Sequence, residues 1–349
     1  MSKFKIAVLG ASGYTGADLI RLALAHPRME IVALSGERKA GQPVNAVWPH
    51  FIGYPLPDLV AAEDIDFAQV DAVFGCLPHA TSQQIIKTIF ANPRPPRVID
   101  LSADFRLTDP AVYEQWYGNP HAALELQAEA VYGLSEFARD ALKGARLAAC
   151  PGCYPTAALL ALLPLLHASL IRPVNITINA LSGVSGAGRS LKESNLFAEV
   201  AEAMHPYGLG HHRHMPEIEQ ELARAAGTPL TISFTPHLVP INRGELETIT
   251  VELADGRTPA DLKAALEARY RDEPFVHVLP GSTAPATRMV RGSNHCVLNV
   301  FADRIPGRAI VVSAIDNLVK GSSGQAIQNF NLMFGLPETM GLEQAPLFP

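Results

Sequence analysis

The most constraining feature of this sequence is an apolar segment, Phe4 to Leu9, that runs through a glycine-rich turn into Ala17 to Ala25, which is apolar at helical spacing. A strand, a glycine turn and a helix in this order open the βαβ unit of doubly wound folds, where backbone N–H groups meet a pyrophosphate at the helix N-terminus. A plain βα turn is the alternative, because the spacing G-x-x-G-x-x-G departs from the usual G-x-G-x-x-G. The predicted dinucleotide-binding residues are Gly10, Ser12, Gly13, Tyr14, Thr15 and Gly16.

The end of the second predicted strand, Glu30 to Leu34, bears on the choice of dinucleotide. An acidic residue at this point usually binds the ribose 2′-OH of NAD, whereas a nearby arginine accommodates the 2′-phosphate of NADP. Ser35, Arg38 and Lys39 therefore favour NADP. Glu37 argues against this choice, and a solvated surface loop is the alternative interpretation.

Two further buried strands, Ala72 to Leu77 and Arg97 to Leu101, flank a predicted helix from Ser82 to Phe90. This alternation predicts a parallel, doubly wound sheet with ligands beyond the carboxyl ends of its strands. Arg106 follows the second of these strands, and its planar guanidinium is suited to bind an anionic group of a substrate. A surface ion pair with Asp104 or Asp109 is the alternative.

Cys153 stands just before an apolar segment, Thr156 to Leu170, which is predicted to be a buried helix with Pro155 at its first position and a possible kink at Pro164. A thiol at a helix N-terminus is favoured as the thiolate, the form that attacks carbonyl carbon. Cys153 is therefore the candidate nucleophile. A buried structural thiol is the alternative.

The chain contains four cysteines, too few and too scattered for a disulfide scaffold, and a reducing cytoplasm fits this usage best. Cys150 and Cys153 form a C-x-x-C, the spacing of redox pairs and of half a zinc site. No second cysteine pair accompanies them, so no metal is predicted, and Cys150 receives no role.

Beyond the cysteine helix, many strands and few helices predict a mixed or antiparallel α+β domain. Residues 1–150 are the predicted NADP-binding Rossmann domain, and residues 151–321 the catalytic and oligomerisation domain. The predicted strands span residues 175–181, 230–235, 246–253, 275–279, 296–302 and 309–314, and the predicted helices 216–226, 259–270 and 326–334.

A histidine cluster, His211 to His214, precedes Pro216 and Glu217. In an extended segment His212 and His214 project to the same side. Either could act as a general base, held neutral by the helix N-terminus and oriented by Glu217. A structural role is the alternative.

Two loops rich in glycine and serine follow predicted strands and could bind anions with their backbone N–H groups. In the first, Ser182 and Arg189 are candidates for substrate, and Ser185 and Gly186 for cofactor. The alternative for the first loop is a flexible loop without a ligand, and the alternative for the second is an ordinary helix start. The candidate cofactor residues of the second loop are Asn317, Gly321 and Gln325.

Composition indicates a globular chain with small-molecule ligands. The 349 residues are 48% apolar and 18% charged, with a net charge of −6 and no large run of one sign, so neither nucleic acid nor a membrane surface is expected as a partner. No apolar stretch approaches the ~20 residues of a membrane span. No secretory signal is recognisable at Met1.

Together these motifs resemble the N-acetyl-γ-glutamyl-phosphate reductases of arginine biosynthesis, within the semialdehyde dehydrogenase superfamily. The resemblance covers essentially the whole chain. Its most specific parts are the cysteine and histidine segments; the five segments are Gly10 to Gly16, Asp100 to Leu107, Pro151 to Thr156, His212 to Ile218 and Asn317 to Gln325.

The resemblance implies an NADPH-dependent reduction of an acyl phosphate through a Cys153 thioester, with His212 as the favoured acid and base. It also implies a homodimer or homotetramer, and a C-terminal segment, 322–349, that returns to the Rossmann domain. The nearer alternative is another acyl-phosphate reductase such as aspartate-semialdehyde dehydrogenase. The farther one is a non-catalytic dinucleotide-binding sensor.

Overall fold

The computed structural model describes residues 2–348, which divide into two compact units. The first unit comprises the residues up to Pro151 together with Ser322–Glu343, and the second comprises Gly152–Gly321 and the residues from Gln344 onward. The first boundary lies one residue after the predicted one. The segment after Glu343 differs from the prediction, because the Leu347 N–H donates to the Arg291 carbonyl and so holds this segment to the second unit.

The first unit is built on a seven-stranded sheet in which every pair of neighbouring strands is parallel. The strand order is β3-β2-β1-β4-β5-β7-β6, so the order reverses beside β1, the position at which doubly wound sheets bind ligands. This confirms the predicted Rossmann-type sheet. Its strands are β1 Phe4–Leu9, β2 Met29–Ser35, β3 Leu59–Val60, β4 Ala72–Gly75, β5 Arg97–Asp100, β6 Val131–Tyr132 and β7 Leu147–Ala149.

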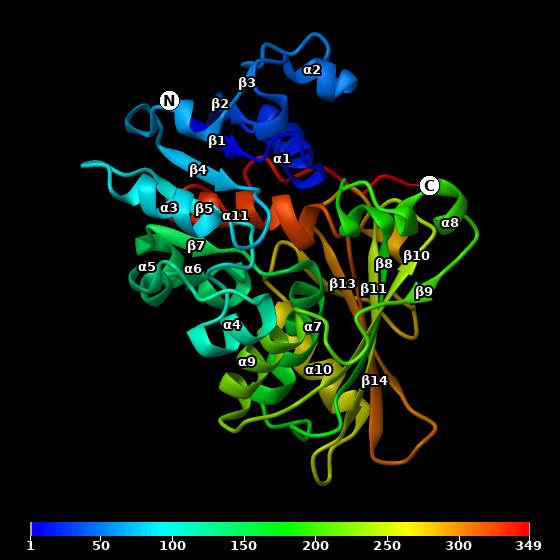
Figure 1. Cartoon of the computed structure of the whole chain (residues 1–349). Helices are drawn as coiled ribbons and strands as arrows, with labels where there is room; N and C mark the ends of the chain where they lie inside the picture. Colours follow the sequence, from blue (N-terminus) through cyan, green and yellow to red (C-terminus); the bar gives the residue numbers. More distant parts are fainter. Residues whose placement is uncertain (1, 349) are drawn as a thin grey trace. The chain divides into compact units, whose positions relative to one another are not determined.

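A helix from the far end of the chain completes the core of the first unit. This helix, α11, packs against α1, α6 and β5 (Figure 1). Its Phe330 is fully buried, with its ring 5.9 Å from that of Phe4 and 5.8 Å from that of Phe74. The helices of this unit are α1 Tyr14–Ala25, α2 Val44–Val47, α3 Ser82–Phe90, α4 Pro110–Tyr117, α5 Leu124–Glu129, α6 Ser135–Gly144 and α11 Gly324–Met333.

The second unit has a mixed sheet of seven strands in the order β12-β13-β14-β11-β8-β10-β9. β8 pairs with β10 in parallel, whereas β11 is antiparallel to both of its neighbours, β8 and β14. The predicted α+β domain with a mixed sheet is therefore confirmed. Its strands are β8 Thr177–Gly183, β9 His205–Pro206, β10 Ser233–Val239, β11 Glu245–Glu252, β12 Val276–Val278, β13 Cys296–Ala302 and β14 Arg308–Ile315.

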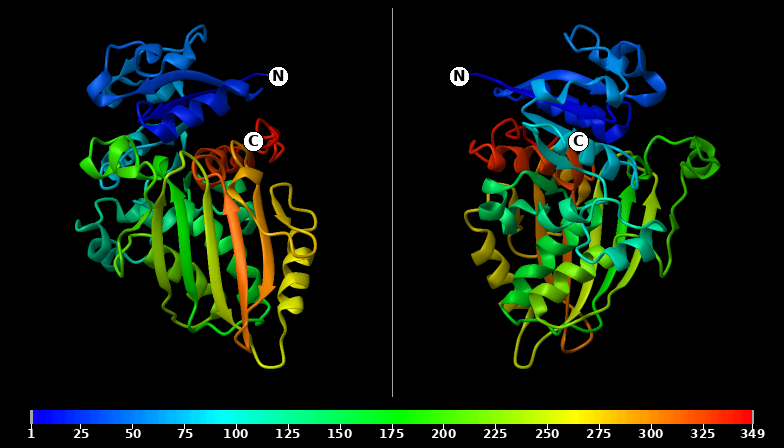
Figure 2. Two further views of the ribbon diagram at one scale, coloured as in Figure 1. Left: turned by 90° about the vertical axis from the view of Figure 1, so that its right-hand side faces the viewer. Right: turned by 60° about the vertical axis from the view of Figure 1, so that its left-hand side comes forward.

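Helices cover one face of this second sheet and leave the other face bare, as the left view of Figure 2 shows. The covering helices are α7 Cys153–His167, α9 Met215–Ala226 and α10 Pro259–Tyr270. Along β11, alternate residues are buried and half-buried, which is the pattern of a strand with one covered face. A short helix, α8 Phe197–Val200, lies in the segment between β8 and β9.

Helix α7 is apolar all round because it packs against α9, α10, β11 and β14 at once. It begins at Cys153, with Gly152 as its N-cap, rather than with Pro155 at its first position as predicted. Pro155 is tolerated as the third residue because its missing N–H has no partner within the first turn. The thiol of Cys153 is therefore part of the helix.

The histidine segment is not extended, contrary to the prediction. After the short strand β9 the chain turns repeatedly, and His214 has helical backbone angles, φ −81° and ψ −12°, as the N-cap of α9. Among residues 2–348 no helix is both long and apolar enough to span a bilayer.

Candidate active site

Cys153 is half-buried at the first turn of α7, and two contacts fix its backbone. The Gly152 N–H donates to Oε1 of Glu217 at 2.9 Å. Gly321 lies so close that a Cβ at this position would be 2.7 Å from the Cβ of Cys153. Any side chain at position 321 would therefore displace the cysteine.

Aromatic rings and two histidines gather beside the cysteine, around Tyr154. The Tyr154 ring lies 5.6 Å from that of His212 and 5.7 Å from that of His214, and the two imidazoles are 5.0 Å apart. The Tyr154 hydroxyl is hydrogen-bonded to the Tyr207 hydroxyl at 2.8 Å. The turns between β9 and α9 thus bring together the two histidines that were expected to share one side of an extended segment.

Burial, followed by the charges of Arg213 and His211, lowers the pKa of His212 to about 4, so its ring is neutral at pH 7. The sequence argument also expected a neutral base but assigned the cause to the helix N-terminus. Nδ1 of His212 accepts the His214 N–H at 3.2 Å. The proton of the neutral ring therefore belongs on Nε2, which makes Nε2 a hydrogen-bond donor.

Several buried carboxyls lie in this part of the second unit, and the sequence analysis singled out only Glu217 among them. Glu245 and Glu247 are fully buried on the helix-covered side of β11. One signal could have identified them. They occupy alternate positions in line with Ile249 and Val251, where the pattern of a half-buried strand calls for apolar residues.

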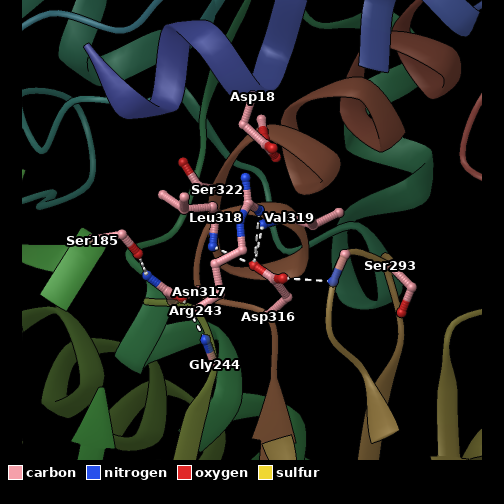
Figure 3. A network of polar contacts seen from close by, with 12 residues as sticks. Asp18, Ser185, Arg243, Gly244, Ser293, Asp316, Asn317, Leu318, Val319 and Ser322 are labelled. Carbon is pink, nitrogen blue, oxygen red and sulfur yellow. Dashed lines mark hydrogen bonds and ion pairs between the residues drawn. The ribbon is translucent and has the colours of Figure 1, made fainter. Parts of the chain in front are cut away.

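The serine- and glycine-rich loop after β8 meets the loop after β14 (Figure 3). Nδ2 of Asn317 donates to Oγ of Ser185 at 2.9 Å, and Oδ1 of Asn317 accepts the Gly244 N–H at 2.8 Å. A Cβ on Gly186 would lie 3.0 Å from Oγ of Ser182. Four predicted binding residues, Ser182, Ser185, Gly186 and Asn317, are therefore neighbours.

Asp316 organises this junction, and the sequence analysis did not identify it. Its buried carboxylate accepts the N–H groups of Leu318 at 2.9 Å, Val319 at 3.2 Å and Gly292 at 2.6 Å. Arg243 approaches the same carboxylate at 3.5 Å (Figure 3). The carboxylate thus fixes the course of the chain that leads to Gly321.

In the first unit, the predicted glycine turn has the geometry that requires glycine. Gly10 has φ +77°, and a Cβ on it would lie 2.2 Å from the Cys76 carbonyl oxygen. A Cβ on Gly16 would lie 2.5 Å from the Gly10 carbonyl oxygen. Gly13 caps α1 without any side-chain hydrogen bond, so no side chain of the N-cap covers the first N–H groups of the helix. This end of α1 fits a pyrophosphate.

The residues after β2 divide into structural and exposed ones. Ser35 is fully buried and accepts the Gly10 N–H at 3.1 Å, so its hydroxyl supports the glycine turn. Oε1 of Glu37 accepts the Ala62 N–H at 3.2 Å, while Arg38 and Lys39 are exposed. The only acidic side chain of this segment is thus engaged with the main chain, which leaves the two cations at its surface.

Trp48 is a further residue at this turn that the sequence analysis missed. Its Nε1–H donates to the Ala11 carbonyl at 2.9 Å, and its ring lies 6.0 Å from that of Tyr14. No motif marks this tryptophan in the sequence, so no local signal could have found it.

Two family models match the chain. One, described as the NAD binding domain of semialdehyde dehydrogenase, covers residues 5–145, and the other, described as the semialdehyde dehydrogenase dimerisation domain, covers residues 153–317. The chain is 56% identical over 345 residues to the probable chloroplastic N-acetyl-gamma-glutamyl-phosphate reductase of Oryza sativa subsp. japonica, across 99% of this chain and 82% of that protein. It is 55% identical to the N-acetyl-gamma-glutamyl-phosphate reductase of Rhodospirillum rubrum, across 99% of both chains.

The chain belongs to the N-acetyl-gamma-glutamyl-phosphate reductase family. Its fold is also similar to that of aspartate semialdehyde dehydrogenase II from Vibrio cholerae, with a TM-score of 0.72 at 17% identity over 95% of this chain and 98% of that one. The aspartate semialdehyde dehydrogenase of Candida albicans, solved with NADP, gives a TM-score of 0.70 at 18% identity, over 95% of this chain and 98% of that one.

Two further candidate residues of this N-acetyl-gamma-glutamyl-phosphate reductase family member, Arg106 and Gln325, are buried, whereas Arg189 is exposed. Arg106 is only 5% exposed, so it does not lie at the surface, and its guanidinium donates to the carbonyls of Cys150 and Leu101. Nε2 of Gln325 donates to the Gly133 carbonyl and to Oγ of Ser135 inside the first unit.

Cys150, which received no role, is buried in the first unit. Burial raises the pKa of its thiol to about 12, against the opposing effect of the hydrogen bond from Nδ2 of Asn329. This thiol is therefore not a competing nucleophile at neutral pH.

Proposed function

We propose that this chain reduces N-acetyl-γ-glutamyl phosphate to N-acetylglutamate semialdehyde, with release of inorganic phosphate, as a step of arginine biosynthesis. Relatives that are about 55% identical to it over 99% of this chain bear the name of this activity. The observation that carries the proposal is the thiol of Cys153 at the first turn of α7, beside two histidines.

The proposed chemistry uses Cys153 as a covalent catalyst. The thiolate attacks the acyl carbon, a C–S bond forms, and the C–O bond to phosphate breaks with its electrons on the leaving group. The product on the enzyme is a thioester. A bound nicotinamide cofactor supplies the hydride that reduces this thioester. Backbone N–H groups at the start of α7 are suited to stabilise the oxyanion.

The histidines are proposed to act as donor and proton carrier. The ring of His212 is neutral with its proton on Nε2, which suits a hydrogen bond to an oxygen that gains negative charge. His214 is the proposed second member of the pair. Glu217 is proposed to hold the start of α7 in place through Gly152.

The proposed cofactor is NADPH, because exposed Arg38 and Lys39 follow β2 while Glu37 binds the main chain. Arg106, Ser182 and Arg189 are proposed to bind the anionic groups of the substrate. The other proposed cofactor residues are Gly10, Ser12, Gly13, Tyr14, Thr15, Gly16, Ser35, Ser185, Gly186, Asn317, Gly321 and Gln325.

A spectrophotometric assay of NADPH formation tests the function in the oxidative direction. N-acetylglutamate semialdehyde, phosphate and NADP should give a rate that disappears when phosphate is omitted. Aspartate semialdehyde under the same conditions should react far more slowly. A faster rate with aspartate semialdehyde would assign a different substrate, and no rate with either would refute the proposed enzyme.

The proposed assembly is a homodimer or homotetramer formed through the second unit. The match to a dimerisation domain supports it, as do the bare face of the sheet and four exposed apolar side chains between β8 and β9, Leu191, Leu196, Phe197 and Met204. Light scattering measures the mass directly. The proposed compartment is the cytoplasm, where the four free cysteines would stay reduced.

A further inference from the structure

Glu245 and Glu247 form a carboxyl pair at the start of β11 that the proposed chemistry does not yet use. Both side chains are fully buried on the same side of the strand, the side covered by α7. Apart from the Cys153 thiol beside Glu245, their four oxygens have no hydrogen-bond partner within residues 2–348. Two adjacent buried carboxyls cannot both be ionised at moderate cost, so at least one of them retains its proton.

The surroundings of the pair are acidic or neutral. Asp316 adds negative charge beside Glu245, and Glu245 does the same beside Glu247. The phenols of Tyr154 and Tyr207 are also within range, since the charge of Glu245 contributes to the raised pKa of each after burial does. No cation contributes to the pKa of either carboxyl.

Cys153 is the reactive group that meets this pair. Glu245 is paired with Ile315 in the β11–β14 ladder, and the Ile315 side chain lies beside Gly321, against which Cys153 packs. Burial raises the pKa of Glu245 to about 8, while a side-chain hydrogen bond with Cys153 acts in the opposite direction. Burial raises the pKa of Glu247 well above its usual range, with the charge of Glu245 as the second cause.

We propose that Glu245 is the proton acceptor of the Cys153 thiol, and that its carboxyl keeps this proton while the thioester exists. Glu247 stays protonated throughout and prevents a second negative charge from forming beside Glu245. The proposal rests on the proposed function for its place in the reaction, although the proton sharing itself needs neither substrate nor cofactor.

The proton balance closes over one turnover. The S–H bond breaks, the proton moves to the Glu245 carboxylate, and the sulfur lone pair forms the C–S bond as phosphate leaves. When the reduced intermediate breaks down, the C–S bond cleaves with its electrons on sulfur, and the carboxyl returns the proton. The proton that the departing phosphate needs comes from a different source, for which the histidine pair is suited.

The first test is the pH dependence of Cys153 alkylation by iodoacetamide in the full-length protein without ligands, followed by mass spectrometry of the cysteine peptide. Thiol and carboxyl that share a proton titrate as a pair, so the wild-type rate should rise in two steps. Glu245→Gln leaves only the thiol to titrate. Its profile should show one step, with a midpoint at least about one pH unit below the upper wild-type step.

Two variants serve as matched controls. Glu247→Gln replaces a carboxyl that is already neutral and should leave both steps in place. Glu252→Gln, at the other end of β11 where the carboxylate binds Asn175, should behave as wild type. An unchanged profile in Glu245→Gln, or loss of a step in Glu247→Gln alone, would overturn the proposal.

Proton release on alkylation provides a second measurement that needs no variant. Alkylation of an isolated thiol releases one proton per sulfur. If Glu245 takes up the proton, wild-type protein in weakly buffered solution at about pH 8, where this carboxyl is partly ionised, should release clearly less than one, because alkylation removes the Cys153 hydrogen bond that lowers the pKa of Glu245. One full proton per alkylated Cys153 would refute the sharing, whatever the outcome of the reductase assay.

Discussion

Helices α1 and α7 both begin after a glycine N-cap that provides no side-chain hydrogen bond, yet their surroundings differ. At α1 the neighbouring turn consists of glycines and small residues, and its exposed end suits an anion that arrives from solution. At α7 the carboxylate of Glu217 already accepts the Gly152 N–H, and Glu245 lies buried beside the first residue. A position at a helix N-terminus is therefore not enough to ionise a cysteine, because nearby carboxyl groups counteract the effect of the helix dipole on the thiol.

The largest expected effect comes from replacing Cys153 at the start of α7, which should abolish the chemistry without affecting the helix end at α1. Cys153→Ser should lower turnover by roughly 10⁴-fold or more, since a serine hydroxyl at this place is a far weaker nucleophile. NADPH affinity, measured by fluorescence titration, should change little. Cys296→Ser, which alters a buried thiol beside Ser313, is the matched control and should retain activity. Turnover by the Cys153→Ser enzyme would remove Cys153 from the mechanism.

The next effect probes the donor beside α7. His212→Asn should reduce kcat about 100-fold, the scale of losing one hydrogen bond to a developing oxyanion, and His214→Asn should reduce it less. His212→Gln should recover part of the loss, because its amide reaches further toward the position of Nε2. If His212→Gln is as impaired as His212→Asn while His214→Asn is worse than both, the two histidines exchange roles.

A substitution in the glycine turn before α1 tests the other of the two helix N-termini. Gly10→Ala places a Cβ 2.2 Å from the Cys76 carbonyl at φ +77°, so the turn must move. NADPH affinity should fall by about tenfold or more, with a lower melting temperature, while the alkylation profile of Cys153 stays unchanged. Gly118→Ala, at φ +76° with open space around it, controls for backbone strain alone. Equal losses in both variants would contradict a specific role for the turn.

The smallest effect concerns the choice between the two dinucleotides. Arg38→Ala should raise the KM for NADPH by up to about tenfold and leave that for NADH nearly unchanged, because only NADPH carries the 2′-phosphate. Arg94→Ala, an exposed arginine of the same unit, should affect neither. Parallel changes in both Michaelis constants would show that Arg38 does not distinguish the cofactors.

Local signals in the sequence were sufficient for much of the fold. The predicted bounds of the helices Ser82–Phe90 and Pro259–Tyr270 and of the strand Cys296–Ala302 coincide with the structure, because caps and alternation act over a few residues. The start of α7 was predicted too late, since Pro155 was taken as a first position although the extended Gly152 caps the helix. Glu245 was missed because its relation to Cys153 depends on the pairing of β11 with β14, which no local pattern encodes.

The position of α11 in the sequence also affects the order in which the two units fold during synthesis. Residues up to 151 emerge from the ribosome first, but the sheet they form lacks Phe330 and the rest of α11 until residue 333 has been made. The intervening 152–321 contain every strand of the second sheet, so this unit can fold in the meantime. The usual order, in which the N-terminal domain is finished first, is thus reversed, and the early segment must wait with its apolar surface exposed.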